Sequence, residues 1–233
     1  MAGPAVVDPE RAAMPAVPNV PEELAQLPYA HLLQPHSGPL RADQRYDTVH
    51  FDGTEHGGAA GGAGFLECAF TGVHFDGAGL RRASFNEAWV HGSRLVATDL
   101  AESEWQDSAV LGSVLAGIAW YGCALRRVVL RQCKLESVNL RGATLRDVVF
   151  EDCLLRDVDF GEARMTEVAF PGSTLEEVRL GGAKLSKVDL RGAVRLGLAD
   201  GHLGLRGAVI STHQLFELAP QFAQALGIVV KDG

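Results

Sequence analysis

The side chains that could do chemistry in this sequence are eight histidines, four cysteines and pairs of acidic residues such as Glu176 and Glu177. No two histidines have the spacing of a metal site, and no Cys-x-x-Cys pair occurs, so the sequence predicts no metal ligands. No nucleophile can be matched with a base and a group that orients that base. We therefore predict no catalytic residues and no cofactor, and an enzyme of unknown class is only a remote alternative.

The glycine-rich segment 57–62 has the composition of a phosphate-binding loop. Such a loop ends in Gly-Lys followed by Ser or Thr and opens a helix, and neither feature follows residue 62. We interpret this segment instead as a flexible excursion.

The four cysteines, Cys68, Cys123, Cys133 and Cys153, are separated by multiples of five and reveal a five-residue period. The last residue of each five-residue block is apolar at 26 consecutive positions from residue 65 to residue 190, and 21 of these residues are Leu or Phe. The residue two positions earlier is always small or β-branched, and all four cysteines belong to this second column. We therefore interpret them as buried packing residues, with Cys133 and Cys153 stacked in the same column.

A five-residue period fits neither an α-helix, which repeats every 3.6 residues, nor a strand, which repeats every two. It requires a chain that bends by a quarter turn in each block, so that four blocks close one square coil. Stacked coils then bury the large and the small column together, at roughly the inter-strand spacing of 4.8 Å. The 26 blocks predict about six and a half coils.

Blocks such as VDLRG at 188–192 and VNLRG at 138–142 resemble the A(D/N)LXX motif of the pentapeptide-repeat family. The resemblance covers the chain from residue 65 to the end of the repeat near residue 195 without a gap. It implies an all-β fold, a right-handed quadrilateral parallel β-helix. Blocks 90–120 are the least regular, and the coil could bulge there. The Asp or Asn that the motif places before the central Leu occurs only at Asp99, Asn139, Asp159 and Asp189.

Four regions are expected along the chain. Residues 1–39 hold eight of the ten prolines and predict a disordered leader, with a short helix near 22–27 as an alternative. Residues 40–64 form a first coil segment and the glycine-rich loop, residues 65–195 form the β-helix, and residues 196–233 form a C-terminal helical cap.

A cap is needed because the open end of a solenoid exposes its core. Residues 211–214, Ser-Thr-His-Gln, resemble a capping box that opens a helix, and Pro220 suits the start of a second short helix that stops at Gly227. This segment resembles the C-terminal module of actinobacterial pentapeptide-repeat proteins. It either caps the solenoid only or also forms a homodimer, and its candidate residues are Leu215, Phe216, Leu218, Phe222 and Leu226.

Residues 20 apart share a face of the predicted solenoid, and one face carries an outward apolar stripe. A contiguous apolar stripe usually marks a contact with a partner. Two alternatives are that the leader or a second copy covers the stripe, or that flat β faces tolerate Ala and Val. The candidate contact residues are Trp89, Ala109, Leu111, Val129, Val149 and Ala169, and Ala69 lies on the same face one coil before Trp89.

The net charge of −8 argues against binding of nucleic acid, which requires clusters of Lys and Arg. No secretory signal and no membrane-spanning run is visible, so we expect a cytoplasmic protein without membrane contact. Arginines such as Arg126, Arg127 and Arg131 interrupt the acidic faces. The candidate acidic surface is Glu87, Glu104, Asp107, Asp157, Glu176 and Glu177.

These observations favour a non-enzymatic, rigid scaffold that binds an unknown protein partner. The resemblance to family members that confer fluoroquinolone resistance implies an alternative, a DNA mimic that binds DNA gyrase or another topoisomerase and so confers antibiotic resistance.

Overall fold

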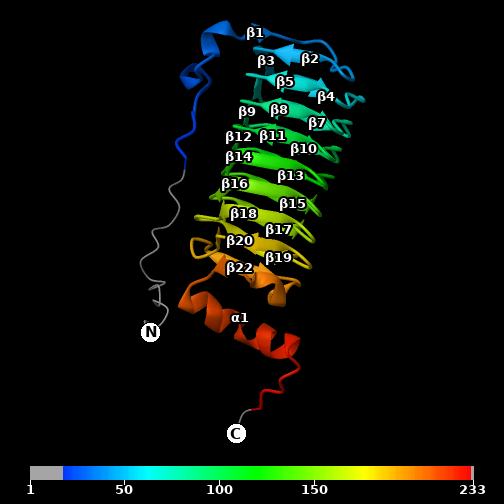
Figure 1. Ribbon diagram of the computed structural model, residues 1–233. Helices are drawn as coiled ribbons and strands as arrows, with labels where there is room; N and C mark the ends of the chain where they lie inside the picture. The colour runs from blue at the N-terminus through cyan, green and yellow to red at the C-terminus, as the bar shows by residue number, and fades with distance from the viewer. Residues whose placement is uncertain (1–17, 232–233) are drawn as a thin grey trace, which may run out of the picture.

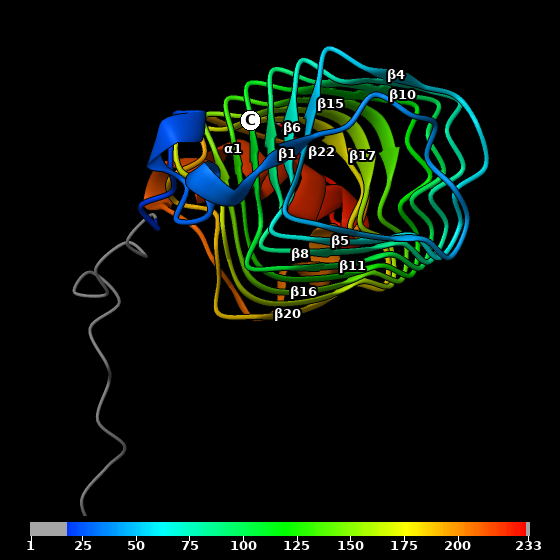
Figure 2. The same ribbon diagram turned by 90° about the horizontal axis from the view of Figure 1, so that it is seen from above.

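The structure is a computed structural model that describes residues 18–231, and most of that chain winds into a right-handed parallel β-solenoid of about eight coils (Figure 1). Seen along its axis, the solenoid has a four-sided outline, and successive coils lie over one another (Figure 2). A single α-helix closes the C-terminal end. The expected quadrilateral parallel β-helix with a short helical cap is therefore confirmed.

The strands are short because the chain bends between neighbouring faces. One sheet of 15 strands includes long strands that continue round a bend, and a second sheet has eight strands. The strands are Gln34–Pro35 (β1), Arg45–Asp47 (β2), Val49–Asp52 (β3), Glu55–His56 (β4), Gly64–Leu66 (β5), Ala69–Thr71 (β6), His74–Asp76 (β7), Ser84–Asn86 (β8), Trp89–His91 (β9), Arg94–Val96 (β10), Glu104–Gln106 (β11), Ala109–Leu111 (β12), Val114–Ala116 (β13), Ala124–Arg131 (β14), Lys134–Asn139 (β15), Thr144–Glu151 (β16), Leu154–Asp159 (β17), Arg164–Ala169 (β18), Thr174–Val178 (β19), Lys184–Ser186 (β20), Val188–Asp189 (β21), Arg195–Leu198 (β22) and Ala208–Val209 (β23). The helices are the 3₁₀ turns Leu24–Gln26 (η2), Ala30–Leu32 (η3) and His202–Leu205 (η4), and the α-helix Thr212–Ala225 (α1).

The register between coils is four five-residue blocks through the regular part of the solenoid. Leu125 of β14 pairs with Leu145 of β16, and Phe65 of β5 pairs with Phe85 of β8. Both columns lie inside: every central residue from 65 to 190 is buried except the partly buried Leu185. Aromatic members of the column stack on one another, as in the pair Phe150 and Phe170, whose rings are 5.0 Å apart.

The quarter turn is made by a left-handed residue two positions after each central residue from 65 to 185. Gly142, for example, follows Leu140 and has φ of +67°. Glycine adopts this conformation without steric cost, whereas other residues lose stability there. Among residues 18–231, eighteen non-glycine residues also adopt it, with φ between 49° and 58°.

The irregular blocks 90–120 do not bulge, contrary to the sequence-based expectation. Trp105 pairs with Phe85 in one direction and with Leu125 in the other, each one full coil away. The small side chain of Ser103 leaves room for the two tryptophans, and its hydroxyl oxygen accepts the indole N–H of both Trp105 and Trp120, at 3.2 and 3.1 Å.

The glycine-rich segment is part of the first coil, so its interpretation as a flexible excursion was wrong. Residue 59 forms a bridge with Gly79, and Gly62 donates a backbone hydrogen bond to the carbonyl of Arg81. The frame changes here because His56 and Ala60, only four positions apart, both face the interior. Coil-to-coil pairs before this step are one position closer in sequence than the later pairs, as for His56 and Phe75.

The described part of the expected leader, residues 18–39, is placed by the structure, so the prediction of disorder is wrong for it; residues 1–17 lie outside the described residues. This part contains η2, η3 and β1, and β1 pairs with β3. Its order follows from apolar side chains that pack on an outward apolar patch of the solenoid.

The C-terminal end also differs from expectation in two respects. The solenoid continues past residue 195 through β22 and β23, with a register shift between Leu175 and Val178 of the neighbouring strand β19. The cap is one continuous helix that passes through Pro220, rather than two short helices. Its capping box is confirmed, because Ser211 and Gln214 exchange side chain to backbone hydrogen bonds of 2.9 and 3.2 Å.

Candidate interaction surfaces

The predicted apolar stripe exists and runs from coil to coil. Ala69 pairs with Trp89, and Ala109 pairs with both Trp89 and Val129. Ala69, Trp89, Ala109 and Leu111 form an apolar cluster that is separate from the interior core. We call the residues Ala69, Trp89, Ala109, Leu111, Val129 and Arg131 the Trp89 face.

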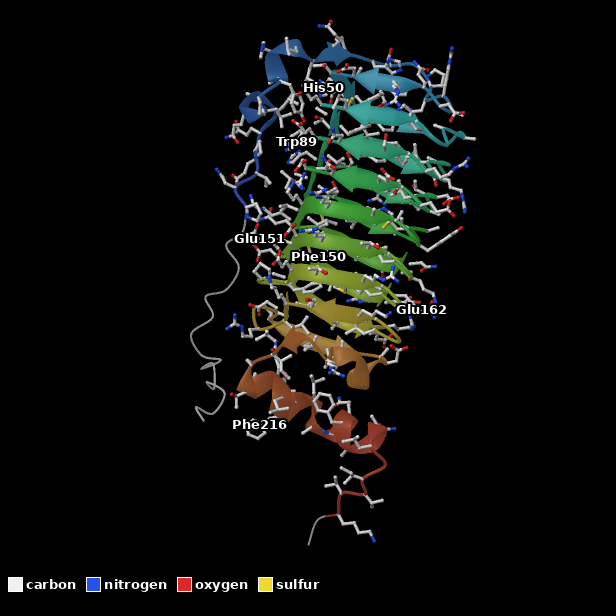
Figure 3. All side chains as sticks on the ribbon, in the orientation of Figure 1. His50, Trp89, Phe150, Glu151, Glu162 and Phe216 are labelled. Atoms are coloured by element: carbon white, nitrogen blue, oxygen red, sulfur yellow. The ribbon has the colours of Figure 1, made fainter. Side chains whose placement is uncertain are left out.

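The N-terminal segment 18–33, which we call the strap, covers the Trp89 face. It lies along the outside of the coils, on the side where Trp89 is labelled (Figures 1 and 3). Trp89 is consequently only 3% exposed. One alternative to contact with a partner is that the leader or a second copy covers the stripe. The N-terminal half of the stripe is covered by the chain's own leader. The strap residues in this cluster are Val20, Leu24, Leu27, Tyr29, Ala30 and Leu33.

Two hydrogen bonds fix the strap to the coils. The indole N–H of Trp89 donates to the carbonyl oxygen of Pro21 at 2.9 Å. The hydroxyl of Tyr29 donates to the carbonyl oxygen of Glu87 at 2.7 Å. Burial, first, and then nearby acidic groups raise the pKa of Tyr29 far above its usual range, so this hydroxyl keeps its proton.

Arg131 provides a further anchor at the N-terminal end of the strap. Its guanidinium forms an ion pair with Glu151 on the neighbouring coil and a longer one, at 3.4 Å, with Glu22 of the strap. It also approaches the carbonyl oxygen of Pro18 at 3.5 Å. A single cation therefore connects the strap to two coils.

A cavity of about 550 Å³ lies between the strap and the coils. Its walls are largely apolar and include Leu27 and Tyr29 from the strap and Trp89 from the solenoid. Glu87, Asp107, Asp147 and Arg127 also line it. The strap therefore packs on the face through its apolar side chains and leaves a cavity beside them.

The three remaining stripe residues continue along the same column. Val129 pairs with Val149, and Val149 pairs with Ala169. They are buried too, and Val149, the most exposed of them, is 7% exposed.

The six candidate acidic residues do not form a continuous anionic surface. Arg127 donates two hydrogen bonds to Asp107 and holds the pKa of that carboxyl below its usual range. Arg179 donates one hydrogen bond to Asp157, at 2.6 Å, and likewise holds the pKa of that carboxyl below its usual range. Glu176 is bound by two arginines. The other three candidates, Glu87, Glu104 and Glu177, form no ion pair within the described part of the chain.

The candidate cap residues divide into two groups. Leu218 is buried and Phe222 is partly buried against the last coils, so these two residues close the core. Leu215, Phe216 and Leu226 are exposed, and Phe216, at 72%, points away from the solenoid (Figure 3). The exposed apolar surface continues through residues 228–230.

Sequence reasoning missed several residues of these surfaces. Gln214 is one, because its side chain donates to the carbonyl oxygens of Leu190 and Ala193, at 2.7 and 3.3 Å, and so satisfies the open backbone of the last coil. Its place in the capping box was a usable signal. The strap was missed as well, although Leu24, Leu27 and Tyr29 are unusual in a proline-rich leader.

The cysteines have the predicted structural role. All four are buried and free, and Cys133 and Cys153 stack, with the backbone N–H of Cys133 donating to the sulfur of Cys153 at 3.4 Å. Burial raises the pKa of the Cys68 thiol to about 11.

Neither a metal cluster nor a membrane span occurs among residues 18–231. They contain no group of three or more His, Cys, Asp or Glu side chains arranged to hold a metal ion. No helix among them has the length and apolarity of a membrane span.

Comparison with known proteins identifies the repeat. The pentapeptide repeat region family model matches residues 111–180, whereas no curated protein matches the sequence. Among solved structures, a trypsin-treated form of QnrB1, a plasmid-mediated fluoroquinolone resistance protein, is 18% identical and aligns over 85% of this chain and 100% of its own, with a TM-score of 0.34.

Two other solved structures are similar at the same level. HetL, a pentapeptide repeat protein of the cyanobacterium Nostoc involved in regulation of heterocyst differentiation, is 20% identical over 77% of this chain and 84% of its own, with a TM-score of 0.28. A pentapeptide repeat protein of the Arabidopsis thaliana thylakoid lumen is 14% identical over 49% of this chain and 77% of its own, with a TM-score of 0.34. The match identifies residues 111–180, inside the four-sided solenoid that these residues help to build, as a pentapeptide repeat region, and it supports the resemblance to the pentapeptide-repeat family.

Proposed function

We propose that the protein is a rigid, non-enzymatic scaffold that acts in the cytoplasm by binding other protein surfaces. The observation that carries the proposal is the apolar surface at the C-terminal end, where Phe216 is 72% exposed and Val230 is 73% exposed. Apolar side chains that cluster on the surface of a folded protein usually mark an interaction site.

The solenoid suits this role because it holds its surface side chains at fixed positions. Each coil is hydrogen bonded to the next through its backbone, and the core runs continuously from Tyr46 to Leu218. A surface that is ordered before binding loses little conformational entropy when a partner docks. The partner therefore meets a preformed pattern of side chains.

The first partner of the C-terminal surface is a second copy of the chain. The exposed side of α1 carries Leu215, Phe216 and Leu226, while Leu218 and Phe222 of the same helix pack inward. Self-association would bury the apolar side that the cap leaves open.

Light scattering of the full-length protein tests this proposal. We expect a dimer for the wild type and a monomer for Phe216→Asp. Gln224→Asp is the matched control, because it adds the same charge at an exposed position of α1 without removing an apolar contact. A wild-type protein that stays monomeric at tens of micromolar would contradict self-association.

The second candidate function is a DNA mimic that binds DNA gyrase. The rod shape and the net charge of −8 favour it. The ion pairs of Asp107, Asp157 and Glu176 oppose it, because they replace a run of negative charges with alternating signs. A gyrase supercoiling assay with and without ciprofloxacin tests the idea, and the absence of both inhibition and protection would dismiss it.

A further inference from the structure

The Trp89 face already holds a peptide segment of this chain, the strap, through a backbone contact. The indole N–H of Trp89 binds the backbone carbonyl of Pro21 rather than a side chain. Proline fixes its own backbone and restricts the residue before it to an extended conformation. A Val-Pro step such as Val20-Pro21 therefore presents its carbonyl to the indole with little entropy left to lose.

The face also selects charge next to the proline. Glu22 follows Pro21 directly and forms an ion pair with Arg131, at 3.4 Å. Arg131 is held in place by its second ion pair, with Glu151. The recognition elements are thus an aromatic donor for the proline carbonyl and a positioned cation for the next side chain.

The strap is attached less firmly than any coil. In the described part of the chain, the backbone hydrogen bonds of residues 22–33 stay within the strap, and the first one to the solenoid runs from Gln34 to Thr48, at 2.9 Å. A cavity of about 550 Å³ lies between the strap and the coils, so the contact of the strap with the solenoid is not continuous. The strap can therefore leave without breaking the backbone pairing of the solenoid.

We propose that the Trp89 face is a docking surface for a peptide segment of a partner protein that carries an apolar residue, a proline and an acidic residue in succession, and that the strap is its built-in competitor. This inference rests on the proposed scaffold function and specifies the chemistry of one partner. The strap excludes weak ligands because, as a tethered segment, it acts at an effective concentration on the order of millimolar.

The experiment uses the full-length chain and a fluorescein-labelled synthetic peptide with the sequence of residues 18–27, PNVPEELAQL. A release variant carries Leu27→Asp and Tyr29→Ser, which place a charge in the apolar contact and remove the hydroxyl anchor. Hydrogen exchange of residues 18–33 reports whether the strap has left. Fluorescence anisotropy measures binding of the peptide.

We expect the release variant to bind the peptide at least tenfold more tightly than the wild type. Adding Trp89→Ala should weaken that binding at least tenfold, whereas the control Glu104→Ala, an exposed residue outside the Trp89 face, should not change it. A peptide with Arg in place of the residue corresponding to Glu22 should bind more weakly, and high salt should reduce the difference.

Three outcomes would overturn the proposal. One is a release variant with rapidly exchanging residues 18–33 that does not bind the peptide. Another is equal binding with Trp89→Ala. The third is a strap that stays protected in the release variant, since it would then be a permanent part of the fold. None of these outcomes bears on the C-terminal surface, so failure here and failure of the scaffold function are distinguishable by the light scattering of Phe216→Asp.

Discussion

Trp89 and Pro21 are 68 residues apart in the chain, yet a hydrogen bond of 2.9 Å joins the indole nitrogen to the proline carbonyl oxygen. Trp89 itself lies outside the interior core and belongs to the small cluster beneath the strap. The strap and the solenoid can therefore be perturbed separately, and the first prediction uses this separation.

Replacing Trp89 with Phe keeps an aromatic ring under the strap and removes only the donor. We expect the free energy of strap opening to fall by about 1 kcal/mol, the net value of one hydrogen bond. The melting temperature of the solenoid should not change, because its core does not contain Trp89. Hydrogen exchange of residues 18–33 measures the first effect and calorimetry the second. Tyr29→Phe, which removes the other donor, is the parallel case, and unchanged exchange in both variants would contradict the assigned anchors.

Ser103 should contribute more to stability than its size suggests. Ser103→Ala leaves the buried indole N–H groups of Trp105 and Trp120 without their acceptor. An unsatisfied buried donor costs about 1–3 kcal/mol, so urea denaturation should show a loss in that range or above it. A double-mutant cycle supplies the control: the same change in a Trp105→Phe, Trp120→Phe background should cost clearly less. Equal losses in both backgrounds would refute the shared acceptor.

Gly142 tests the left-handed position of the bend. A Cβ atom at Gly142 would meet nothing within 4 Å, so Gly142→Ala creates no clash, but its φ is +67°. We expect a loss of about 1–2 kcal/mol in the free energy of unfolding. Gly58→Ala is the matched control, because a Cβ atom there is also unobstructed and its φ is not left-handed. The prediction fails if the two variants have the same stability.

His56 should make the solenoid less stable below neutral pH. Burial, and secondarily the nearby His36, lower the pKa of His56 below its ordinary value of 6.5. The unfolded chain then binds a proton that the folded chain does not, so stability is complete above about pH 6.5 and falls as the pH drops below it. The melting temperature between pH 7.5 and 5.5 should fall less in His56→Leu than in the wild type. His74→Gln, at an exposed position one coil further, is the control and should show the same fall in melting temperature as the wild type. An identical fall in all three proteins would exclude His56 as the source of the pH dependence.

The interior could be predicted from the sequence because one rule governs it. A bend at every fifth residue assigns each Leu or Phe of the column to the core, and residues 65–190 follow that rule without insertion. The step between His56 and Ala60 escaped the rule because His56 is polar and Ala60 is small, so neither has the large apolar side chain of a column residue and no five-residue spacing marked it. Gly57, within this step, is constrained by the close approach of the next coil, because a Cβ atom at this position would lie 2.9 Å from the carbonyl oxygen of Asp76.

The surfaces were less accessible to prediction because they depend on segments far apart in sequence. The stripe was located from positions one coil apart, but its partner, the strap, becomes recognisable only when Pro21 is seen against Trp89. The cap was half predicted. Ser211 and Gln214 marked its start, whereas Pro220 suggested a break that the helix does not make.

The four-block register has a consequence for the length of this protein. Every interior coil has the same two interfaces, one with the coil before it and one with the coil after it, so stability grows by addition of nearly identical units. Duplication of one whole coil beyond the strap contacts, such as 156–175, would lengthen the rod and leave the strap and the cap unchanged. A deletion of a single residue would instead shift the frame of every later block, and the coil would then need a local step like the one between His56 and Ala60. Whole-coil increments lengthen the rod without any such step.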